Sequence, residues 1–174
     1  MRFVLISFLL FTSTSFAADL DRDMKETVGA FYNIYISVRS SGIPSEKEQL
    51  KFKPYISASL ENLLQEAAVA ERKYYKTTKG EVPPLVEGDL FTSLFEGASN
   101  FTVLSCDVRT RSCLVEFNYF EPGNKSSTTW KDKVYLIQGP RGLLVDDIEY
   151  LGNWQFMHKG RLKELLKQVI EEGN

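Results

Sequence analysis

The chain has few of the residues that build metal centres and catalytic sites: one histidine and two cysteines among 174 residues. The histidine, His158, lies far along the chain from the cysteines, and no acid-rich cluster accompanies them, so the pattern does not predict a metal site. The sequence also lacks a Gly-rich phosphate-binding motif and a nucleophile motif. We therefore predict no cofactor, no metal ligand and no catalytic residue.

A strong net charge of either sign is lacking as well. The 21 Lys and Arg residues are balanced by 23 Asp and Glu residues. A nucleic-acid-binding protein would show a basic face, so we expect no nucleic-acid partner. The length suits one domain with a substantial core.

One sustained apolar run occurs, at the N-terminus, and its roughly ten residues are too few to span a membrane. The run covers Phe3 to Phe11 apart from Ser7, follows Arg2 and precedes Ser15-Phe16-Ala17. A positive start, a short apolar run and small residues at a cleavage site are typical of a secretory signal peptide. We expect residues 1–17 to be a signal peptide and residues 18–174 a single domain.

The N-terminal sequence also predicts the cellular location of the mature protein. No cysteine follows the apolar run, so no lipid anchor is predicted. Cleavage removes only one charged residue, Arg2, which leaves 20 basic and 23 acidic residues and a net charge of −3. The mature protein is expected in the periplasm or outside the cell, without a membrane anchor. Retention of residues 1–17 as an N-terminal anchor is the alternative.

The two cysteines, Cys106 and Cys113, flank the turn-like segment Asp-Val-Arg-Thr-Arg-Ser. In a secreted chain, a pair at this spacing across a hairpin predicts a disulfide. A metal site and a redox role are the other interpretations. Redox activity is disfavoured because the spacing is not Cys-x-x-Cys.

Apolar spacing predicts helices in the first half and at the end of the chain, with antiparallel strands between them, which is an α+β fold. The strands number about four. The predicted helices are residues 21–40, a short turn opened by a Ser45–Glu48 capping box, residues 57 or 59 to 76, one turn at 91–97, and residues 159–171. The predicted strands are residues 101–106, 113–120 and the two arms of a hairpin within 130–151, and a loop is predicted at residues 77–89.

The hairpin Trp130–Leu151 turns at Gly139-Pro140-Arg141-Gly142, where glycine and proline mark a turn. Neither arm alternates cleanly between apolar and polar residues, which predicts a central strand pair with helices on one side. Its second arm contains the adjacent acids Asp146 and Asp147. Neighbours in a strand point to opposite faces, so we expect one of the two acids to face an apolar layer.

Five motifs together resemble a known family. They are Phe31-Tyr32, Pro54-Tyr55-Ile56-Ser57, Gly88-Asp89-x-Phe91, Trp130-x-Asp132-x-Val134 and Val145-Asp146-Asp147-Ile148-x-Tyr150-Leu151-Gly152. In this order, over about residues 25–168, the chain resembles the bacterial envelope family catalogued as domain of unknown function 3828. The resemblance implies a cystatin-like or nuclear-transport-factor-2-like cone of helices on a curved sheet, and it implies no activity. The chain departs from the family's lipoproteins because it lacks their lipobox cysteine.

The candidate binding residues are Asp146, Tyr150, Tyr32, Tyr35 and Trp130. Enzymes with such a cone often hold a buried acid, so Asp146 or Asp147 could serve as a general acid or base, with a tyrosine as its hydrogen-bonding partner. The structural alternative is that one acid is exposed and the other accepts bonds from a neighbouring donor. Trp130 and Asp132 equally suit core packing and strand-end hydrogen bonding.

Three functions are consistent with the sequence. The first is a non-enzymatic interaction module that binds another envelope protein or, as an immunity protein does, a toxin, through a strand edge or the long loop. The second is a carrier of a small apolar ligand in the cone mouth. The third, and least favoured, is an acid–base enzyme that uses Asp146 or Asp147.

Overall fold

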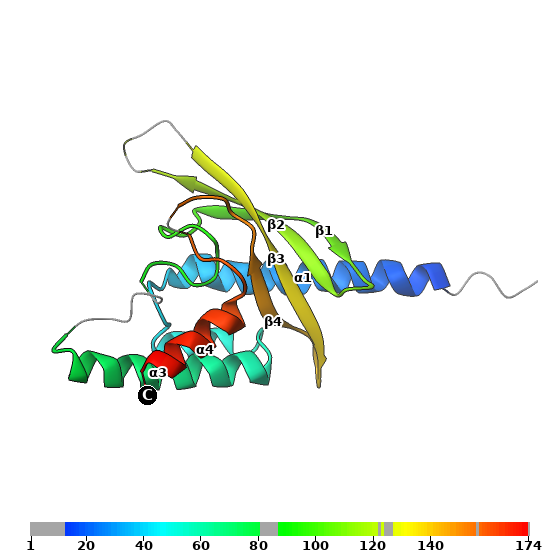
Figure 1. Ribbon diagram of the computed structural model, residues 1–174. Helices are drawn as coiled ribbons and strands as arrows, with labels where there is room; N and C mark the ends of the chain where they lie inside the picture. Colours follow the sequence, from blue (N-terminus) through cyan, green and yellow to red (C-terminus); the bar gives the residue numbers. More distant parts are fainter. Residues whose placement is uncertain (1–12, 81–86, 122, 124–126, 156, 174) are drawn as a thin grey trace, which may run out of the picture.

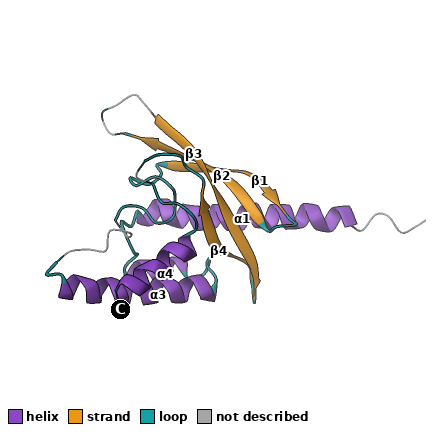
Figure 2. Ribbon diagram, in the orientation of Figure 1, coloured by secondary structure: helices purple, strands orange, loops and turns teal. Residues whose placement is uncertain are grey.

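A single antiparallel sheet organises the described part of the chain, which in this computed structural model comprises residues 13–80, 87–121, 123, 127–155 and 157–173. These residues form four helices and four strands, so the predicted α+β class is confirmed (Figures 1 and 2). The helices are α1 (Ser13–Val38), α2 (Glu46–Phe52), α3 (Ala58–Thr77) and α4 (Leu162–Glu172). The strands are β1 (Asn100–Asp107), β2 (Ser112–Phe120), β3 (Ser127–Gly139) and β4 (Gly142–Tyr150).

The sheet is a meander in the order β1-β2-β3-β4, with each strand antiparallel to the next. The predicted turn of the second hairpin is confirmed, because Gly139 pairs with Gly142 and leaves Pro140 and Arg141 as a two-residue loop. The left-handed φ of +138° at Gly142 is one that residues with a side chain rarely adopt. Glycine is therefore required where the chain enters β4.

Helix α1 crosses the sheet and packs one apolar side against it (Figure 1). Its buried side chains recur at three- and four-residue steps, the period of one helical face. They are Met24, Val28, Phe31, Tyr32 and Tyr35. The predicted helix at residues 21–40 therefore exists, but it begins at Ser13 and ends at Val38. No helix in the described ranges is long and apolar enough to cross a membrane.

The predicted signal peptide lies largely outside the described residues. Ser13 to Ala17 are described, as the first turns of α1, so the helix runs through the predicted cleavage site. These turns extend beyond the sheet (Figure 1). Ala17 and Ala18 are exposed, and among the side chains described from Ala17 onward the first core residue is Met24. Cleavage after Ala17 would leave the described core intact.

The space between α1 and the sheet is filled by aromatic rings. Phe31 makes an edge contact with Phe91 and a tilted contact with Phe52, and Tyr32 makes an edge contact with Phe117. All five side chains have no exposed surface or 1% at most. Full burial of side chains of this size stabilises a fold by roughly 1.5–3 kcal/mol each, so these rings form the centre of the core.

Helices α3 and α4 pack on each other beside β4 (Figure 2). The predicted cap of α3 is confirmed at Ser57, whose Oγ accepts a bond of 3.0 Å from the Leu60 N–H. The predicted capping box is also present, since the Glu48 carboxylate accepts a bond of 2.8 Å from the Ser45 N–H. The closing helix begins at Leu162, three residues later than predicted.

The prediction that the second hairpin is central is wrong for β4, which is an edge strand of the sheet. Its outer edge is nevertheless covered. The Val145 N–H donates to the Tyr55 carbonyl at 2.9 Å, the Ser57 N–H donates to the Val145 carbonyl at 2.8 Å, and further along the Tyr150 N–H donates to the Gly160 carbonyl at 3.0 Å. Because its outer edge is bonded to Tyr55, Ser57 and Gly160, β4 can be as apolar as an interior strand.

Strand β4 also carries a β-bulge, which the sequence did not predict. Tyr135 of β3 pairs with Asp147, but its neighbour Leu136 pairs with Val145, so Asp146 is an extra residue without a cross-strand partner. Inward-facing side chains then occur at Val145 and Ile148, three residues apart, and both are fully buried. The predicted alternation of Asp146 and Asp147 between opposite faces is therefore wrong, because a bulge breaks the two-residue period.

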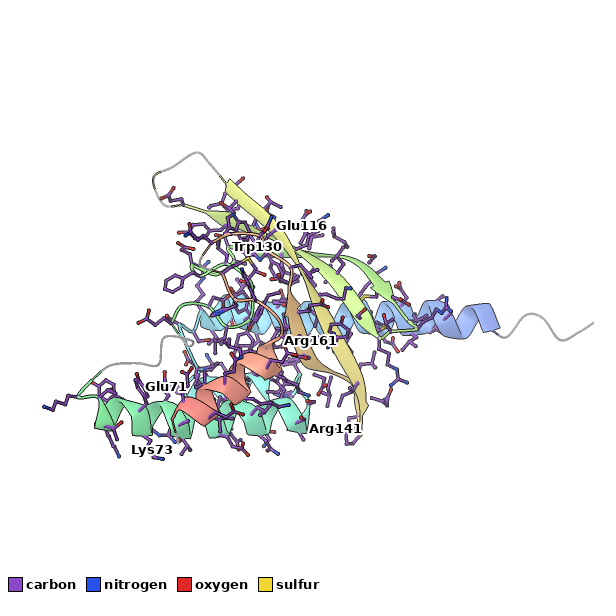
Figure 3. The ribbon with its side chains drawn as sticks, viewed as in Figure 1. Glu71, Lys73, Glu116, Trp130, Arg141 and Arg161 are labelled. Carbon is purple, nitrogen blue, oxygen red and sulfur yellow. A yellow bond between two sulfur atoms is a disulfide. The ribbon has the colours of Figure 1, made fainter. Side chains whose placement is uncertain are left out.

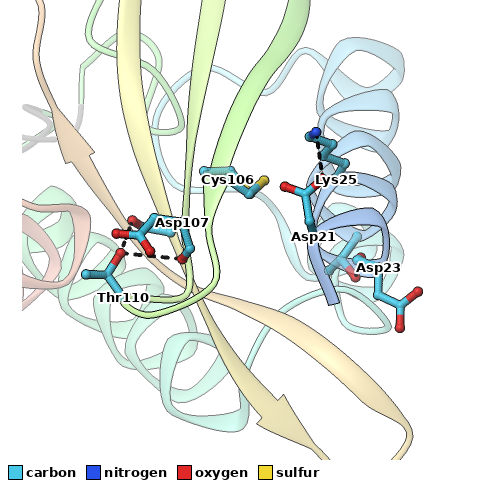
Figure 4. Close-up of a disulfide and its surroundings, with 9 residues drawn as sticks. Asp21, Asp23, Lys25, Cys106, Asp107 and Thr110 are labelled. Atoms are coloured by element: carbon cyan, nitrogen blue, oxygen red, sulfur yellow. Dashed lines mark hydrogen bonds and ion pairs between the residues drawn. A yellow bond between two sulfur atoms is a disulfide. The ribbon is translucent and has the colours of Figure 1, made fainter. Parts of the chain in front are cut away.

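The predicted disulfide is confirmed. Cys106 and Cys113 pair directly across β1 and β2 and their sulfurs are bonded. Figure 4 shows Cys106 beside the first part of α1, where Lys25 binds Asp21 at 2.7 Å. At the adjoining turn the Asp107 carboxylate accepts a bond of 2.8 Å from the Arg109 N–H. A disulfide fits an oxidising compartment outside the cytoplasm.

Candidate functional site

Three of the predicted site residues converge on one segment, Gly88–Ser99, which joins the long loop to β1. Tyr32 and Tyr35 come from α1, and Tyr150 comes from the end of β4. Their hydroxyls reach successive residues of the segment: Tyr35 donates to the Asp89 carboxylate at 3.0 Å, Tyr150 to the Leu90 carbonyl at 2.7 Å and Tyr32 to the Phe91 carbonyl at 3.2 Å. Burial raises the pKa of all three hydroxyls, so they remain protonated donors.

Asp89 is the acid at the centre of this arrangement. Its side chain is buried, and its carboxylate accepts bonds from the Tyr35 hydroxyl, the Thr92 hydroxyl and the Phe91 N–H. Burial raises its pKa to about 7, against the lowering effect of bonds from Thr92, Phe91 and Tyr35. Asp89 is therefore able to exchange a proton near neutral pH.

A second buried acid, Asp132 on β3, holds the middle of the segment. Its carboxylate accepts bonds from both the N–H and the hydroxyl of Ser93, from the Trp130 indole N–H at 3.1 Å and from the Leu151 N–H at 2.9 Å. Burial raises its pKa, and the Ser93 hydroxyl is the strongest of the bonds that oppose this. The predicted site residue Trp130 thus orients Asp132, in agreement with its structural interpretation.

The segment Gly88–Ser99 has no helix. The single helical turn predicted at Phe91–Gly97 is wrong, and bends and a turn replace it. Its backbone is held instead by the Asp89 and Asp132 carboxylates and by the tyrosine hydroxyls, which supply the bonds that a helix would have made internally.

The chain after β4 lies beside this segment (Figure 1, green and orange). The Gly152 N–H donates to the Ser93 hydroxyl at 3.1 Å, and a ring nitrogen of His158 lies 2.9 Å from the Asp89 carbonyl oxygen. Burial lowers the pKa of His158, so its ring is neutral at neutral pH. These bonds join the segment Gly88–Ser99 and the chain after β4, which are far apart in sequence, into one unit.

Two aromatic side chains emerge from this unit into solvent. Phe95 is 48% exposed and Trp154 is 37% exposed. Each lies over a glycine: a Cβ added at Gly88 would be 2.5 Å from the Phe95 ring, and one at Gly152 would be 2.5 Å from the Trp154 ring. Trp154 also makes an edge contact with Trp130, at 5.9 Å between centroids. The two exposed rings are therefore held in defined positions.

We call Phe95, Leu151 and Trp154 the aromatic face. Leu151 is 42% exposed. A surface hollow of about 410 Å³ lies between Phe95 and Trp154, with Leu94 and Met157 in its walls. Another, of about 440 Å³, joins Trp154 to Leu151. The three side chains thus lie around two hollows that meet at Trp154, and the walls of these hollows also include polar residues such as Glu96 and Lys131.

A third hollow of about 270 Å³ lies on the other side of Phe95, and we call it the Tyr35 pocket. Its walls come from the C-terminal end of α1, the turn that follows it, the segment Gly88–Ser99 and the end of β2. Tyr35 and Asp89 both line it. The ionisable acid described above therefore adjoins a surface cavity.

The fifth predicted site residue, Asp146, lies elsewhere. Its carboxylate accepts bonds from the Ser57 hydroxyl at 2.6 Å and from the Lys163 ammonium at 2.7 Å. Its neighbour Asp147 accepts a bond of 3.1 Å from the Lys163 N–H and pairs with Arg161 at 3.6 Å. Both acids anchor the start of α4, and Asp146 also binds the N-cap residue of α3. The other four predicted site residues lie around Gly88–Ser99. Figure 3 shows Trp130 and Arg161, the partner of Asp147, at separate positions in the molecule.

The structure shows which of the two acids is the more desolvated. Asp147 is the more buried acid, with a side chain that is 10% exposed, and burial raises its pKa. The side chain of Asp146 is 21% exposed. Because of the bulge, Asp146 turns toward Ser57 and Lys163, which satisfy it at the edge of the sheet.

The signal in the sequence for the two buried acids, Asp89 and Asp132, is weak. Asp89 occurs in the motif Gly88-Asp89-x-Phe91, and Asp132 in Trp130-x-Asp132-x-Val134, but neither motif shows what its acid binds. No group of three or more His, Cys, Asp or Glu side chains within the described ranges is arranged to hold a metal ion.

Comparison with known proteins assigns no family. No protein-family model and no curated protein matches the chain. The chain is similar to the crystal structure of a protein of unknown function from Bacteroides thetaiotaomicron VPI-5482, with 12% sequence identity and a TM-score of 0.44 over 78% of this chain and 95% of that chain. The resemblance to domain of unknown function 3828 stays a prediction.

Proposed function

We propose that the protein is an extracytoplasmic, periplasmic interaction module and that it binds a partner protein through the aromatic face. The observation that supports this best is the presentation of Phe95 and Trp154. Both rings are exposed, and each is fixed over a glycine, Phe95 on the segment Gly88–Ser99 and Trp154 on the chain after β4. Binding energy at protein interfaces concentrates in such preorganised aromatic anchors.

The surroundings of the anchors also suit an interface. The hollows on either side of Trp154 can receive side chains of a partner, and polar groups such as Glu96, Asn153 and Gln155 border them. An apolar centre with a polar rim is the usual composition of a protein–protein interface. The partner is expected to present apolar side chains that enter these hollows.

The rigidity of the segment would lower the cost of binding. Three tyrosine hydroxyls and two buried carboxylates hold its backbone before any partner arrives. A surface that is ordered in the free protein loses little conformational entropy on association. The buried acids therefore act in this proposal as supports for the binding surface. The carrier and the acid–base enzyme stay predictions.

The test is a comparison of single alanine variants of the mature protein, immobilised and exposed to envelope extract from its own source. Trp154→Ala and Phe95→Ala should each reduce the yield of the partner that wild type retains by tenfold or more, the size expected for a hot-spot residue. Tyr75→Ala is the matched control, because Tyr75 is 55% exposed but lies on α3. Equal recovery by Trp154→Ala and Tyr75→Ala would contradict the proposal.

A further inference from the structure

The Tyr35 pocket shares Phe95 and Glu96 with the hollow between Phe95 and Trp154, but its walls carry more hydroxyl groups. Tyr35, Ser40, Ser41, Ser99 and Tyr119 all line it. Walls of this kind suit a polar molecule, whereas the hollow between Phe95 and Trp154 is lined mainly by apolar side chains.

The Ser40 hydroxyl is the clearest indication that the Tyr35 pocket binds a ligand. Its Oγ is buried, and among the described residues it has no hydrogen-bond partner. Buried hydroxyls nearly always have a partner, so an unpaired one that borders a cavity indicates a group that a ligand can satisfy.

The turn after α1 brings a cation to the same cavity. Arg39 has a left-handed φ of 49°, which residues other than glycine rarely adopt. The Arg39 N–H still donates to the Tyr35 carbonyl at 2.9 Å, and the Gly42 N–H donates to the Gly88 carbonyl at 2.5 Å. These bonds hold Arg39 and Ser40 against the segment that contains Asp89. Within the described ranges, no ion pair joins the Arg39 guanidinium to an acid.

Gly97 keeps the floor of the pocket open. A Cβ at this position would lie 2.8 Å from the Tyr35 hydroxyl and 3.4 Å from Asp89. Its φ of +75° also disfavours a residue with a side chain. The Tyr35 hydroxyl accepts a bond of 2.8 Å from the Ala98 N–H, and Tyr35 lines the pocket beside Gly97.

We propose that the Tyr35 pocket binds a small hydroxylated carboxylate, with the carboxylate paired to Arg39 and accepting bonds from the Ser40 and Tyr35 hydroxyls. The guanidinium is the cation best matched to a carboxylate, since it offers parallel N–H donors. The remaining serine and tyrosine hydroxyls of the walls suit the hydroxyl groups of the ligand. Glu96, at the rim, disfavours a ligand with more than one negative charge.

Ligand binding in the Tyr35 pocket should also depend on whether Asp89 is protonated. Tyr35 donates its hydroxyl hydrogen to ionised Asp89, and it cannot give the same hydrogen to a ligand. When Asp89 is protonated, its carboxyl group can donate to the Tyr35 oxygen, and the Tyr35 hydrogen turns to the pocket. Ligand binding should therefore favour protonated Asp89.

Other groups around Asp89 do not titrate in the same range. Tyr35 and Tyr150 face it from α1 and β4, and their raised pKa values keep them neutral. His158 contacts its carbonyl from the chain after β4 and is neutral as well, because burial lowers its pKa. Arg39 and Glu96 line the pocket as charged groups. The proton taken up near neutral pH is thus assigned to Asp89.

Three sugars with similar rings and different charge test the ligand class: D-glucuronate, D-glucose and D-glucosamine. Each is titrated into the ¹⁵N-labelled mature protein while the amide resonances of residues 39–41 and 96–99 are followed. Glucuronate should give saturable shifts, and its affinity should be about tenfold higher at pH 6 than at pH 8, since a group with a pKa of about 7 is mostly protonated at the lower pH. Glucose and glucosamine should bind more weakly.

Two variants assign the contacts. Arg39→Gln should weaken glucuronate binding by tenfold or more, the usual effect of a lost charge-assisted bond, while Arg141→Gln, on the distant β3–β4 turn (Figure 3), should leave it unchanged. Ser40→Ala should weaken binding about fivefold with an unchanged urea midpoint, because its hydroxyl has no partner inside the protein.

The absence of a saturable shift with glucuronate at pH 6 would overturn the proposal. So would equal binding of glucose or glucosamine, or equal affinities of the Arg39→Gln and Arg141→Gln variants. Loss of glucuronate binding would leave the partner-binding proposal standing, because Trp154, whose variant tests that proposal, does not line the Tyr35 pocket.

Discussion

Asp146 and Asp147 are adjacent on β4, yet both carboxylates accept hydrogen bonds from Lys163: Asp146 from the ammonium at 2.7 Å and Asp147 from the backbone N–H at 3.1 Å. Regular strand geometry would send the two side chains to opposite faces. The bulge at Asp146 brings them to the same partner. An anion at the start of α4 also interacts favourably with the helix dipole. The acidic pair is therefore an anchor for α4.

The two acids should respond differently to neutralisation. Asp146→Asn leaves the part-buried Lys163 ammonium without its counter-charge and should destabilise the protein by about 1–3 kcal/mol. Asp147→Asn keeps an oxygen for the Lys163 N–H and loses only the half-exposed pair with Arg161, so at most about 1 kcal/mol is expected. Urea melts measure both values. Glu66→Gln, at an exposed position on α3, is the control. A larger effect at Asp147 would contradict this assignment.

The raised pKa of Asp89 predicts a pH dependence of stability with a definite sign. The folded protein holds a proton on Asp89 up to about pH 7, whereas the unfolded chain releases it near its ordinary value of 3.8. The stabilisation is thus fully present below pH 3.8 and is lost as pH rises through 7, by roughly 4 kcal/mol in total. Urea melts at pH 5 and pH 8 should show wild type losing more stability than Asp89→Asn. Parallel losses in both proteins would show that Asp89 does not titrate in this range.

The disulfide between Cys106 and Cys113 should stabilise the folded protein by about 2–3 kcal/mol, according to the chain-entropy model for a short closed loop. The double variant Cys106→Ser, Cys113→Ser should unfold at correspondingly lower urea concentration. A free-thiol assay on denatured, unreduced wild-type protein should detect no thiol. Detection of two thiols would mean that the protein matures in a reducing compartment.

The N-terminus of the mature protein is expected at Ala18. Mass spectrometry of protein from the periplasm should give the mass of residues 18–174, since a signal peptidase recognises Ser15-x-Ala17. The shortened protein should be as stable as a chain that begins at Ser13, because Met24 is the first core residue among the described side chains. A retained Met1 or a lipid adduct would contradict the prediction.

Most of the fold could be predicted because its signals are local. The apolar spacing in α1 and α4, the Ser57 cap and the Gly139–Gly142 turn are each written within a few residues, and the structure has all of them. The bulge at Asp146 and the cover of β4 by Tyr55 and Ser57 depend on partners far away in sequence. One extra residue in a strand alters the composition and the apolar–polar alternation too little for a bulge to be recognised from the sequence.

The candidate site was predicted less completely, for a related reason. Tyr32, Tyr35 and Tyr150 were identified as hydrogen-bonding residues, but the sequence does not show that their hydroxyls reach a segment more than 50 residues away. Asp89 follows a glycine in a loop, where aspartate commonly stabilises a turn. Its burial and its altered pKa arise only when α1, β4 and the chain after β4 assemble around it.

The most direct test of the proposed function places a photo-crosslinking amino acid in the protein within living cells, at position 95, 154 or 75. Phe95 and Trp154 belong to the aromatic face, and Tyr75, on α3, is more exposed than either of them. After irradiation, positions 95 and 154 should each give an adduct with the same partner protein, and position 75 should give none. Adducts of equal yield at all three positions, or no common partner for positions 95 and 154, would contradict the proposal that this face binds another protein.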